Sequence, residues 1–106
     1  MNHIFEQIAA ERKRQDEKWG ERNLPMLRRD SDLTTVKVYL KEYKRVNALD
    51  ALSKDTNWMR IFLEKIYDAF AETDPVKSRE EMVQVAAVAV QIIEYLDRQI
   101  DGGKGC

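Results

Sequence analysis

The sequence "FLEKIYDAFAETDPVKSREEMVQVAAVAVQIIEYL", which runs from Phe62 to Leu96, decides the fold. It places two segments with apolar residues at helical spacing on either side of Asp74-Pro75. The residue before a proline avoids the helical region, so the first helix is expected to end there. Pro75 suits the first position of a second helix, with Asp74 as its cap. The stretch therefore predicts two consecutive helices joined by a short turn.

Both helices carry apolar faces that need a partner. The first is expected to begin after a cap at Asp55, Thr56 or Asn57. Its apolar face consists of side chains at helical spacing: Ile61, Phe62, Ile66, Ala69 and Phe70. The second helix, to about Ile100, is apolar nearly all round. It must therefore be buried on several sides, either in the centre of the monomer or against a second subunit.

The sequence before this stretch predicts two further helices. Apolar residues near a 3.6-residue period predict a helix over residues 33–53, with Ser31 or Asp32 as its cap. Residues 2–19 predict another helix, and Gly20 is its expected stop.

The fold class that follows is all-α, a four-helix bundle that is expected to be completed by oligomerisation. Residues 1–100 are predicted to form a single domain. The stretch 21–32 carries a proline and no clear period, which indicates a loop. Residues 101–106, "DGGKGC", are expected to be a flexible tail.

Composition gives no support to several kinds of partner and site. The 18 basic and 19 acidic side chains leave a net charge of −1, so no overall field favours nucleic acid or an anionic membrane as a partner. No apolar run approaches the ~20 residues of a membrane span, and the N-terminal residues do not read as a signal peptide, which predicts a cytoplasmic protein. A single cysteine, Cys106, and a single histidine, His3, exclude a disulfide within the chain, a cysteine cluster and a multi-histidine metal site.

Acidic side chains on the two central helices form a candidate magnesium site. Glu64 and Asp68 are four residues apart and project from one helix face. Glu80, Glu81 and Gln84 on the next helix offer further oxygen atoms, which magnesium prefers.

These acids also have structural interpretations. The residues Arg60, Glu64, Asp68 and Glu72 form an i, i+4 ladder that is typical of a solvated helix face. Ser78 followed by Glu81 fits a capping box, in which Glu81 serves only a helix terminus. The aromatic residues nearby are expected in the core rather than as a platform for stacking bases: Trp58, Phe62, Tyr67 and Phe70.

A cluster of cations beside Trp19 offers a second candidate site, for the phosphates and base of a nucleotide. The cations are Arg12, Lys13, Arg14 and Lys18. Acidic residues are interleaved with them, so the alternative is a solvated helix end with internal ion pairs.

Two segments resemble a known family. The segment "WMRIFLEKIYDAFAETDPVKSREEMVQVAAVAVQIIEYLDR" resembles the second half of MazG-like proteins of the all-α nucleoside triphosphate pyrophosphatase group. The stretch "ERKRQDEKWGE" is similar to the opening of their short members. The likeness covers residues 57–98 and 7–21, whereas residues 22–56 match nothing in the family. It implies a helical fold that assembles as dimers or tetramers, binds magnesium (or manganese in its place), and cleaves nucleoside triphosphates to the monophosphate and pyrophosphate.

The resemblance also implies roles for individual residues. The family motif is Glu-Glu-x-x-Glu on one helix and Glu-x-x-Asp on the next, and the chain has Glu64, Asp68 and Glu81 at three of its positions. These three are the expected catalytic residues and, with Gln84, the expected metal ligands. The expected phosphate-binding residues are Arg14, Lys18 and Lys65.

Two residues depart from the motif. Lys65 and Gln84 stand where the family has carboxylates. Positions 65, 68, 81 and 84 together carry a charge of −1 here, against −4 in the full motif, so the field that attracts a cation is weaker. The sequence therefore predicts a magnesium-dependent nucleotide pyrophosphohydrolase or a nucleotide-binding relative. The alternative is a non-catalytic helical oligomer or partner-binding protein on the same scaffold.

Overall fold

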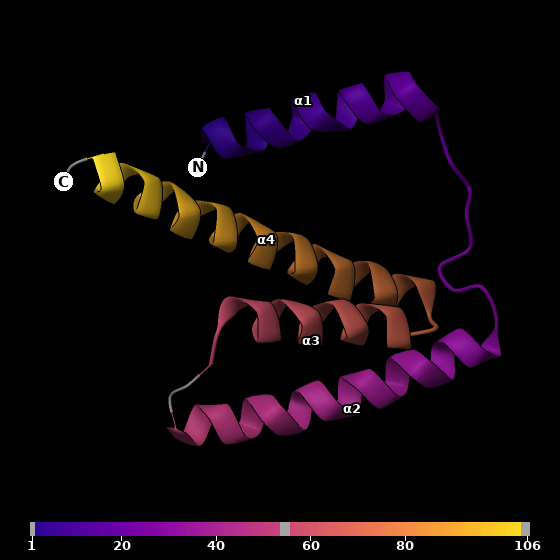
Figure 1. The fold of residues 1–106 in the computed structure, drawn as a ribbon. Helices are drawn as coiled ribbons and strands as arrows, with labels where there is room; N and C mark the ends of the chain where they lie inside the picture. The colour runs from indigo at the N-terminus through magenta and orange to yellow at the C-terminus, as the bar shows by residue number, and fades with distance from the viewer. Residues whose placement is uncertain (1, 54–55, 105–106) are drawn as a thin grey trace. The chain divides into compact units, whose positions relative to one another are not determined.

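The chain is built from four α-helices. The computed structural model describes residues 2–53 and 56–104. Its helices are α1 (Asn2–Trp19), α2 (Asp30–Ser53), α3 (Trp58–Ala71) and α4 (Pro75–Lys104), as Figure 1 shows. Within the described residues there is no strand, which confirms the all-α class.

The helices fall into two compact units. Unit 1 consists of Met1–Pro25 and Val90–Cys106, and unit 2 consists of Met26–Ala89. Unit 1 thus contains α1 and the second half of α4, while unit 2 contains α2, α3 and the first half of α4. A single domain over residues 1–100 stays a prediction, and each unit is described by itself below.

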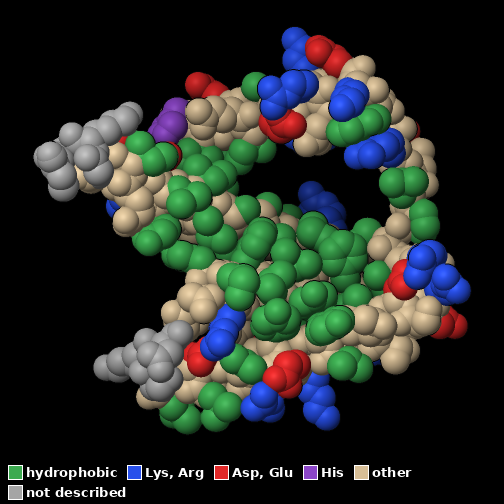
Figure 2. All heavy atoms as spheres, in the orientation of Figure 1, with side chains coloured by type: hydrophobic (Ala, Val, Ile, Leu, Met, Phe, Trp, Pro, Cys, Tyr) green, Lys and Arg blue, Asp and Glu red, His purple; other side chains and the backbone are tan. Residues whose placement is uncertain are grey.

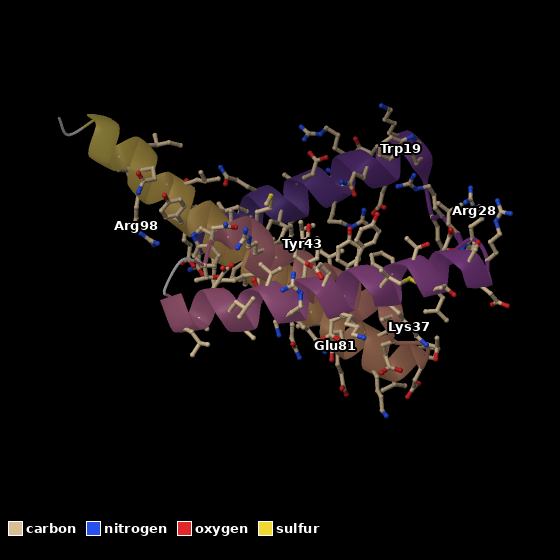
Figure 3. The ribbon with its side chains drawn as sticks, turned by 60° about the horizontal axis from the view of Figure 1, so that its bottom comes forward. Trp19, Arg28, Lys37, Tyr43, Glu81 and Arg98 are labelled. Carbon is tan, nitrogen blue, oxygen red and sulfur yellow. The ribbon has the colours of Figure 1, made fainter. Side chains whose placement is uncertain are left out.

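Three tyrosines join α2 to α3 in unit 2. The ring of Tyr67 on α3 stacks on Tyr39, with 5.5 Å between ring centroids, and on Tyr43, at 5.6 Å. Tyr39 and Tyr43 lie one turn apart on α2, so both reach the same neighbour (Tyr43 is labelled in Figure 3). Offset aromatic stacking of this kind stabilises by about 0.5–1.5 kcal/mol per pair beyond the area buried. The stack fixes α2 against α3.

Side-chain caps mark the beginnings of α3 and α4. Asn57 caps α3 by accepting the Arg60 backbone N–H at 3.0 Å, and Asp74 caps α4 by accepting that of Val76 at 3.2 Å. Both caps were predicted, together with Pro75 as the first helical residue. The third candidate cap in this region, Asp55, lies outside the described residues.

Ser78 ties α4 to α3 rather than capping a helix. It is buried within the first turns of α4, and its hydroxyl donates a hydrogen bond of 3.1 Å to the backbone carbonyl of Ala69. The capping-box interpretation of Ser78 and Glu81 is therefore wrong, because α4 already begins at Pro75.

Helix α2 begins earlier than predicted. Its first residue is Asp30, so Ser31 and Asp32 lie inside the first turn and the predicted cap positions are wrong. The Asp32 carboxylate instead reaches back and accepts the Arg28 backbone N–H at 2.9 Å. The connection between α1 and α2 is correspondingly shorter than 21–32.

In unit 1, α1 ends at a glycine. Gly20 has a φ of +65°, and its N–H donates to the Asp16 carbonyl at 2.8 Å, which is a left-handed helix end. This confirms the predicted stop. Near the other end of α1, Ile4 is only 2% exposed and lines a small hollow of about 250 Å³ with Ile8 and Ile93.

The C-terminal residues extend α4 beyond its predicted end. The helix passes Ile100 and continues to Lys104, so residues 101–104 of the expected tail are helical. Residues 105–106, with Cys106, lie outside the described residues.

Helix α4 is not enclosed by its own chain. Val88 and Val90 are buried, but Val83 is 56% exposed and Leu96 is 50% exposed. The expected burial on several sides in the centre of the monomer does not hold at Val83 and Leu96, whereas burial against a second subunit stays a prediction. Figure 2 shows hydrophobic side chains gathered at the surface over α2 and α3 of unit 2. Within the described residues, none of the helices combines the length and apolar composition that a bilayer span requires.

Candidate functional site

The two residues that depart from the family motif touch one another. Lys65 on α3 donates a hydrogen bond from Nζ to Oε1 of Gln84 on α4, at 3.1 Å. Position 65 therefore faces α4, and position 84 faces α3. The contact brings together the two positions at which the resemblance leads us to expect carboxylates.

Glu64 and Asp68 turn toward α2 instead. The Asn47 amide donates from Nδ2 to Glu64 Oε1 at 3.1 Å, and Lys44 Nζ lies 3.9 Å from Asp68 Oδ1. Both acids are half-buried. One face of α3 thus carries the acids toward α2, and the neighbouring face carries Lys65 toward α4.

The ladder on α3 is not a solvated face. Arg60 forms an ion pair with Asp50 of α2, whose side chain is only 13% exposed. Glu72 accepts the Asp74 backbone N–H at 3.1 Å and so belongs to the turn before α4. Together with the contacts of Glu64 and Asp68, these partners replace the expected row of ion pairs within one helix.

Glu81 projects from α4 in unit 2, as labelled in Figure 3, and is half-buried. Glu80 is exposed. Across residues 2–53 and 56–104, no three or more acidic, histidine or cysteine side chains are grouped so as to hold a metal ion. Glu64, Asp68 and Glu81 are accordingly not brought together as a three-carboxylate group.

The face of α3 toward α2 nonetheless carries oxygen atoms of the kind that coordinate magnesium. It usually takes only one or two protein carboxylates and fills its other positions with water and phosphate oxygens. Glu64 and Asp68, one turn apart, satisfy that smaller requirement. The Oδ1 atom of Asn47 is buried and has no hydrogen-bond partner among the described residues, so a third, neutral oxygen lies on the residue that contacts Glu64. Glu64 and Asp68 are therefore the residues on this face that could supply oxygen ligands to an ion, and the buried Asn47 oxygen is not exposed to one.

The cations of α1 are engaged with neighbours in unit 1. Arg12 hydrogen-bonds Gln15 and Asp16, each at 2.9 Å, and Arg14 pairs with Glu11. The alternative of a helix end with internal ion pairs is therefore confirmed for Arg12 and Arg14. Both are exposed.

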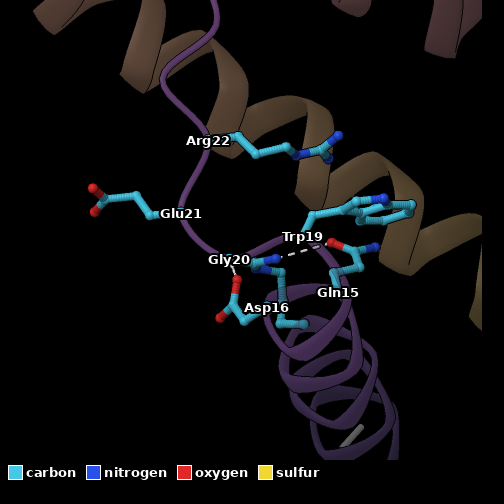
Figure 4. Close-up of a pocket in the computed structure, with 7 residues that line it drawn as sticks. Gln15, Asp16, Trp19, Gly20, Glu21 and Arg22 are labelled. Carbon is cyan, nitrogen blue, oxygen red and sulfur yellow. Dashed lines mark hydrogen bonds and ion pairs between the residues drawn. The ribbon is translucent and has the colours of Figure 1, made fainter.

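Two cations flank Trp19 at the end of α1. Lys18 Nζ lies 4.8 Å and the Arg22 guanidinium carbon 4.6 Å from the ring centroid, within the range of cation–π attraction. A hollow of about 540 Å³ opens beside them and is lined by Trp19, Gly20 and Arg22, among others (Figure 4). The expected phosphate-binding residues are thus divided, with Arg14 and Lys18 in unit 1 and Lys65 in unit 2.

Sequence reasoning missed the contribution of α2. Lys44, Asn47 and Asp50 each contact α3, yet they lie in the region without family resemblance. The sequence signal that could have found them is their spacing of three residues, which places them along one side of the predicted helix, beside its apolar face.

Comparison with known proteins does not assign the chain to a family. No protein-family model, no curated protein and no solved structure matches it.

Proposed function

We propose that this chain binds nucleoside triphosphates with magnesium on the face formed by α2, α3 and the start of α4. It acts as a MazG-like pyrophosphohydrolase or as a nucleotide-binding relative of one. The observation that carries the proposal is the hydrogen bond between Lys65 and Gln84, because it brings two positions of the resembled motif into contact across α3 and α4. Glu64 and Asp68 stand at the other two positions of the first half of that motif, on either side of Lys65.

The residues take distinct roles in this proposal. Glu64 and Asp68 would hold the magnesium ion through their carboxylates. The resemblance also expects Glu81 and, as a neutral ligand through its amide oxygen, Gln84 to bind the ion, although the described residues do not group Glu81 with the other two acids. Bound there with the nucleotide, magnesium would polarise the phosphoryl group that water attacks in line. Lys65 supplies a fixed positive charge for a phosphate, which an ammonium can do as a point charge without bonding to the metal.

Lys44 is a further cation beside this acidic pair. Its Nζ lies 3.9 Å from Asp68 and its side chain is 55% exposed, so it can move to a phosphate without leaving a buried charge unpaired. Lys44 and Lys65 make the field at this face less negative still, which favours an anionic ligand over a bare metal ion.

The test is pyrophosphate release from a panel of ribo- and deoxyribonucleoside triphosphates with magnesium or manganese. The Asp68→Ala protein controls for contaminating activity, and nucleotide binding is measured in parallel by titration calorimetry. Release that vanishes in the control supports hydrolysis, and binding without release supports the nucleotide-binding relative. If folded protein shows neither pyrophosphate release nor nucleotide binding, the proposal is overturned.

A second candidate is a helical oligomer or partner-binding scaffold without catalysis. Its specific support is the exposure of large apolar side chains, among them Val76 (66%) and Leu52 (85%). Sedimentation equilibrium over a range of concentrations tests it. Val83→Glu should weaken assembly if α4 is the interface, whereas Gln91→Glu, at an exposed polar position of the same helix, should not.

A further inference from the structure

A hollow in unit 2 lies at the end of α3 and the beginning of α4. It measures about 480 Å³, and its wall is mainly apolar. The side chains that shape it include Met26, Leu27, Phe70, Pro75, Arg79 and Met82. Small-molecule sites in proteins are mostly apolar clefts of about 300–1,000 Å³ with a few polar groups, and this hollow matches that description.

The residues that line the hollow differ in flexibility. Ser78 is a fixed lining residue of the hollow, because its buried hydroxyl is already hydrogen-bonded to the carbonyl of Ala69. Part of its wall consists of Met26 and Met82, whose unbranched thioether side chains adjust to ligands of different shape. Met26 is 55% exposed, so covering it would remove apolar surface from water.

One charge of the hollow is available to a ligand. Arg79 is exposed and has no ion-pair partner in the part of the chain that the structure describes. Glu72 also lines the hollow, but its carboxylate accepts the Asp74 backbone N–H in the turn before α4. A guanidinium at the edge of an apolar wall selects a ligand with an apolar body and one anionic group.

We infer that this hollow binds a small apolar or aromatic monocarboxylate, with its body against Phe70, Met26 and Met82 and its carboxylate on Arg79. The site is separate from the Lys65–Gln84 contact and does not depend on nucleotide binding. The hollow suits a small molecule rather than a second copy of the chain. Arg79, which has no ion-pair partner among the described residues, lies beside an apolar wall and so complements a single anion.

The probe for this site is 2-naphthoate, with 2-naphthylmethanol as its neutral analogue. The readout is the ¹³C-methyl NMR signals of the methionines. Met26 and Met82 should shift saturably, while Met59 should not, since it is 61% exposed but does not line the hollow. Arg79→Gln should weaken naphthoate binding about tenfold and leave the neutral analogue unchanged. Arg98→Gln, an exposed arginine elsewhere on α4, is the matched control.

Three outcomes would overturn the inference. Parallel shifts of Met59 would mean unspecific apolar binding. Equal affinity for the acid and the alcohol in the parent protein would mean that Arg79 recognises no anion. Shifts of Met26 and Met82 that follow protein concentration without any ligand would mean that a second copy of the chain fills the hollow.

Discussion

Lys65 and Gln84 form a hydrogen bond of 3.1 Å between Nζ and Oε1, and this bond joins α3 to α4 at two positions of the resembled motif. A cation and a neutral amide meet where two carboxylates would otherwise face each other. Two carboxylates at such a contact repel unless a cation lies between them. The lysine thus removes the need for a bound ion in holding these helices together.

Replacing this lysine should raise metal affinity. Lys65→Glu with Gln84→Asp gives carboxylates at positions 65, 68, 81 and 84, and affinity for Mn²⁺ should rise at least about tenfold. Electron paramagnetic resonance of free Mn²⁺ measures it. Lys13→Glu, an exposed substitution on α1 with the same charge change as Lys65→Glu, is the control. Unchanged affinity would mean that position 65 does not face the ion.

Asp68→Ala should abolish magnesium binding without unfolding the protein. Among the described residues it pairs with Lys44 at 3.9 Å, and this pair is exposed enough to contribute at most about 1 kcal/mol. Glu81→Ala should behave likewise. Calorimetry with magnesium and a thermal melt of each variant separate loss of binding from loss of fold. If both variants bind magnesium like the parent protein, Asp68 and Glu81 are not ligands of the ion.

Asn47→Ala should destabilise unit 2 by about 1 kcal/mol. The Asn47 amide donates both to the Arg60 carbonyl, at 3.2 Å, and to Glu64, and both bonds join α2 to α3. The loss is limited because the change also removes a buried oxygen without a partner. Urea unfolding measures the difference. Lys41→Ala, exposed on the same helix, should change stability by less than about 0.5 kcal/mol.

Gly20→Ala and Gly102→Ala should have opposite effects. Gly20 has a φ of +65°, where an alanine costs roughly 1–2 kcal/mol, although no atom lies within 4 Å of the added carbon. Gly102 is helical and equally unobstructed, so alanine there should leave stability unchanged or raise it slightly. Thermal melts of both variants test the pair. A stable Gly20→Ala protein would contradict the left-handed end of α1.

Glu42 should respond to the loss of Arg45. The Arg45 side chain hydrogen-bonds the carboxylate, from Nε to Oε2 at 3.1 Å, and this bond lowers the pKa of Glu42 below 4.5. A lowered pKa means that the contribution to stability is present above the unfolded value and is lost as the pH falls through the folded one. In Arg45→Gln the pKa of Glu42 should return toward 4.5, as followed by ¹³C NMR of the carboxyl group.

Helix ends that depend on local chemistry could be predicted from the sequence. Asn57, Asp74 and Gly20 act through their own side chain or backbone, and the structure places all three as expected. Ser78 shows the opposite case. Its spacing to Glu81 matches a capping box, but a buried carbonyl on another helix determines its role.

The candidate site could be predicted only in part, for the same reason. The family resemblance predicts Glu64, Asp68 and Glu81 from residues within two helices, and their role stays a prediction. Of the three, Glu64 and Asp68 lie toward α2. Lys44 and Asn47 join them only because α2 packs beside α3, and no pattern within α2 reports which neighbour it meets. Tertiary packing also explains why Arg60 of α3 forms an ion pair with Asp50 of α2 rather than with an acid of its own helix.

The hydrogen bond between Lys65 and Gln84 has a consequence for how this surface can change over evolutionary time. The amide of Gln84 accepts a bond from an ammonium through its oxygen, and it can donate one to a carboxylate through its nitrogen. A lysine codon becomes a glutamate codon by a single base change. Gln84 therefore tolerates either charge at position 65, and the contact provides a viable intermediate between a cationic and an acidic form of the same surface.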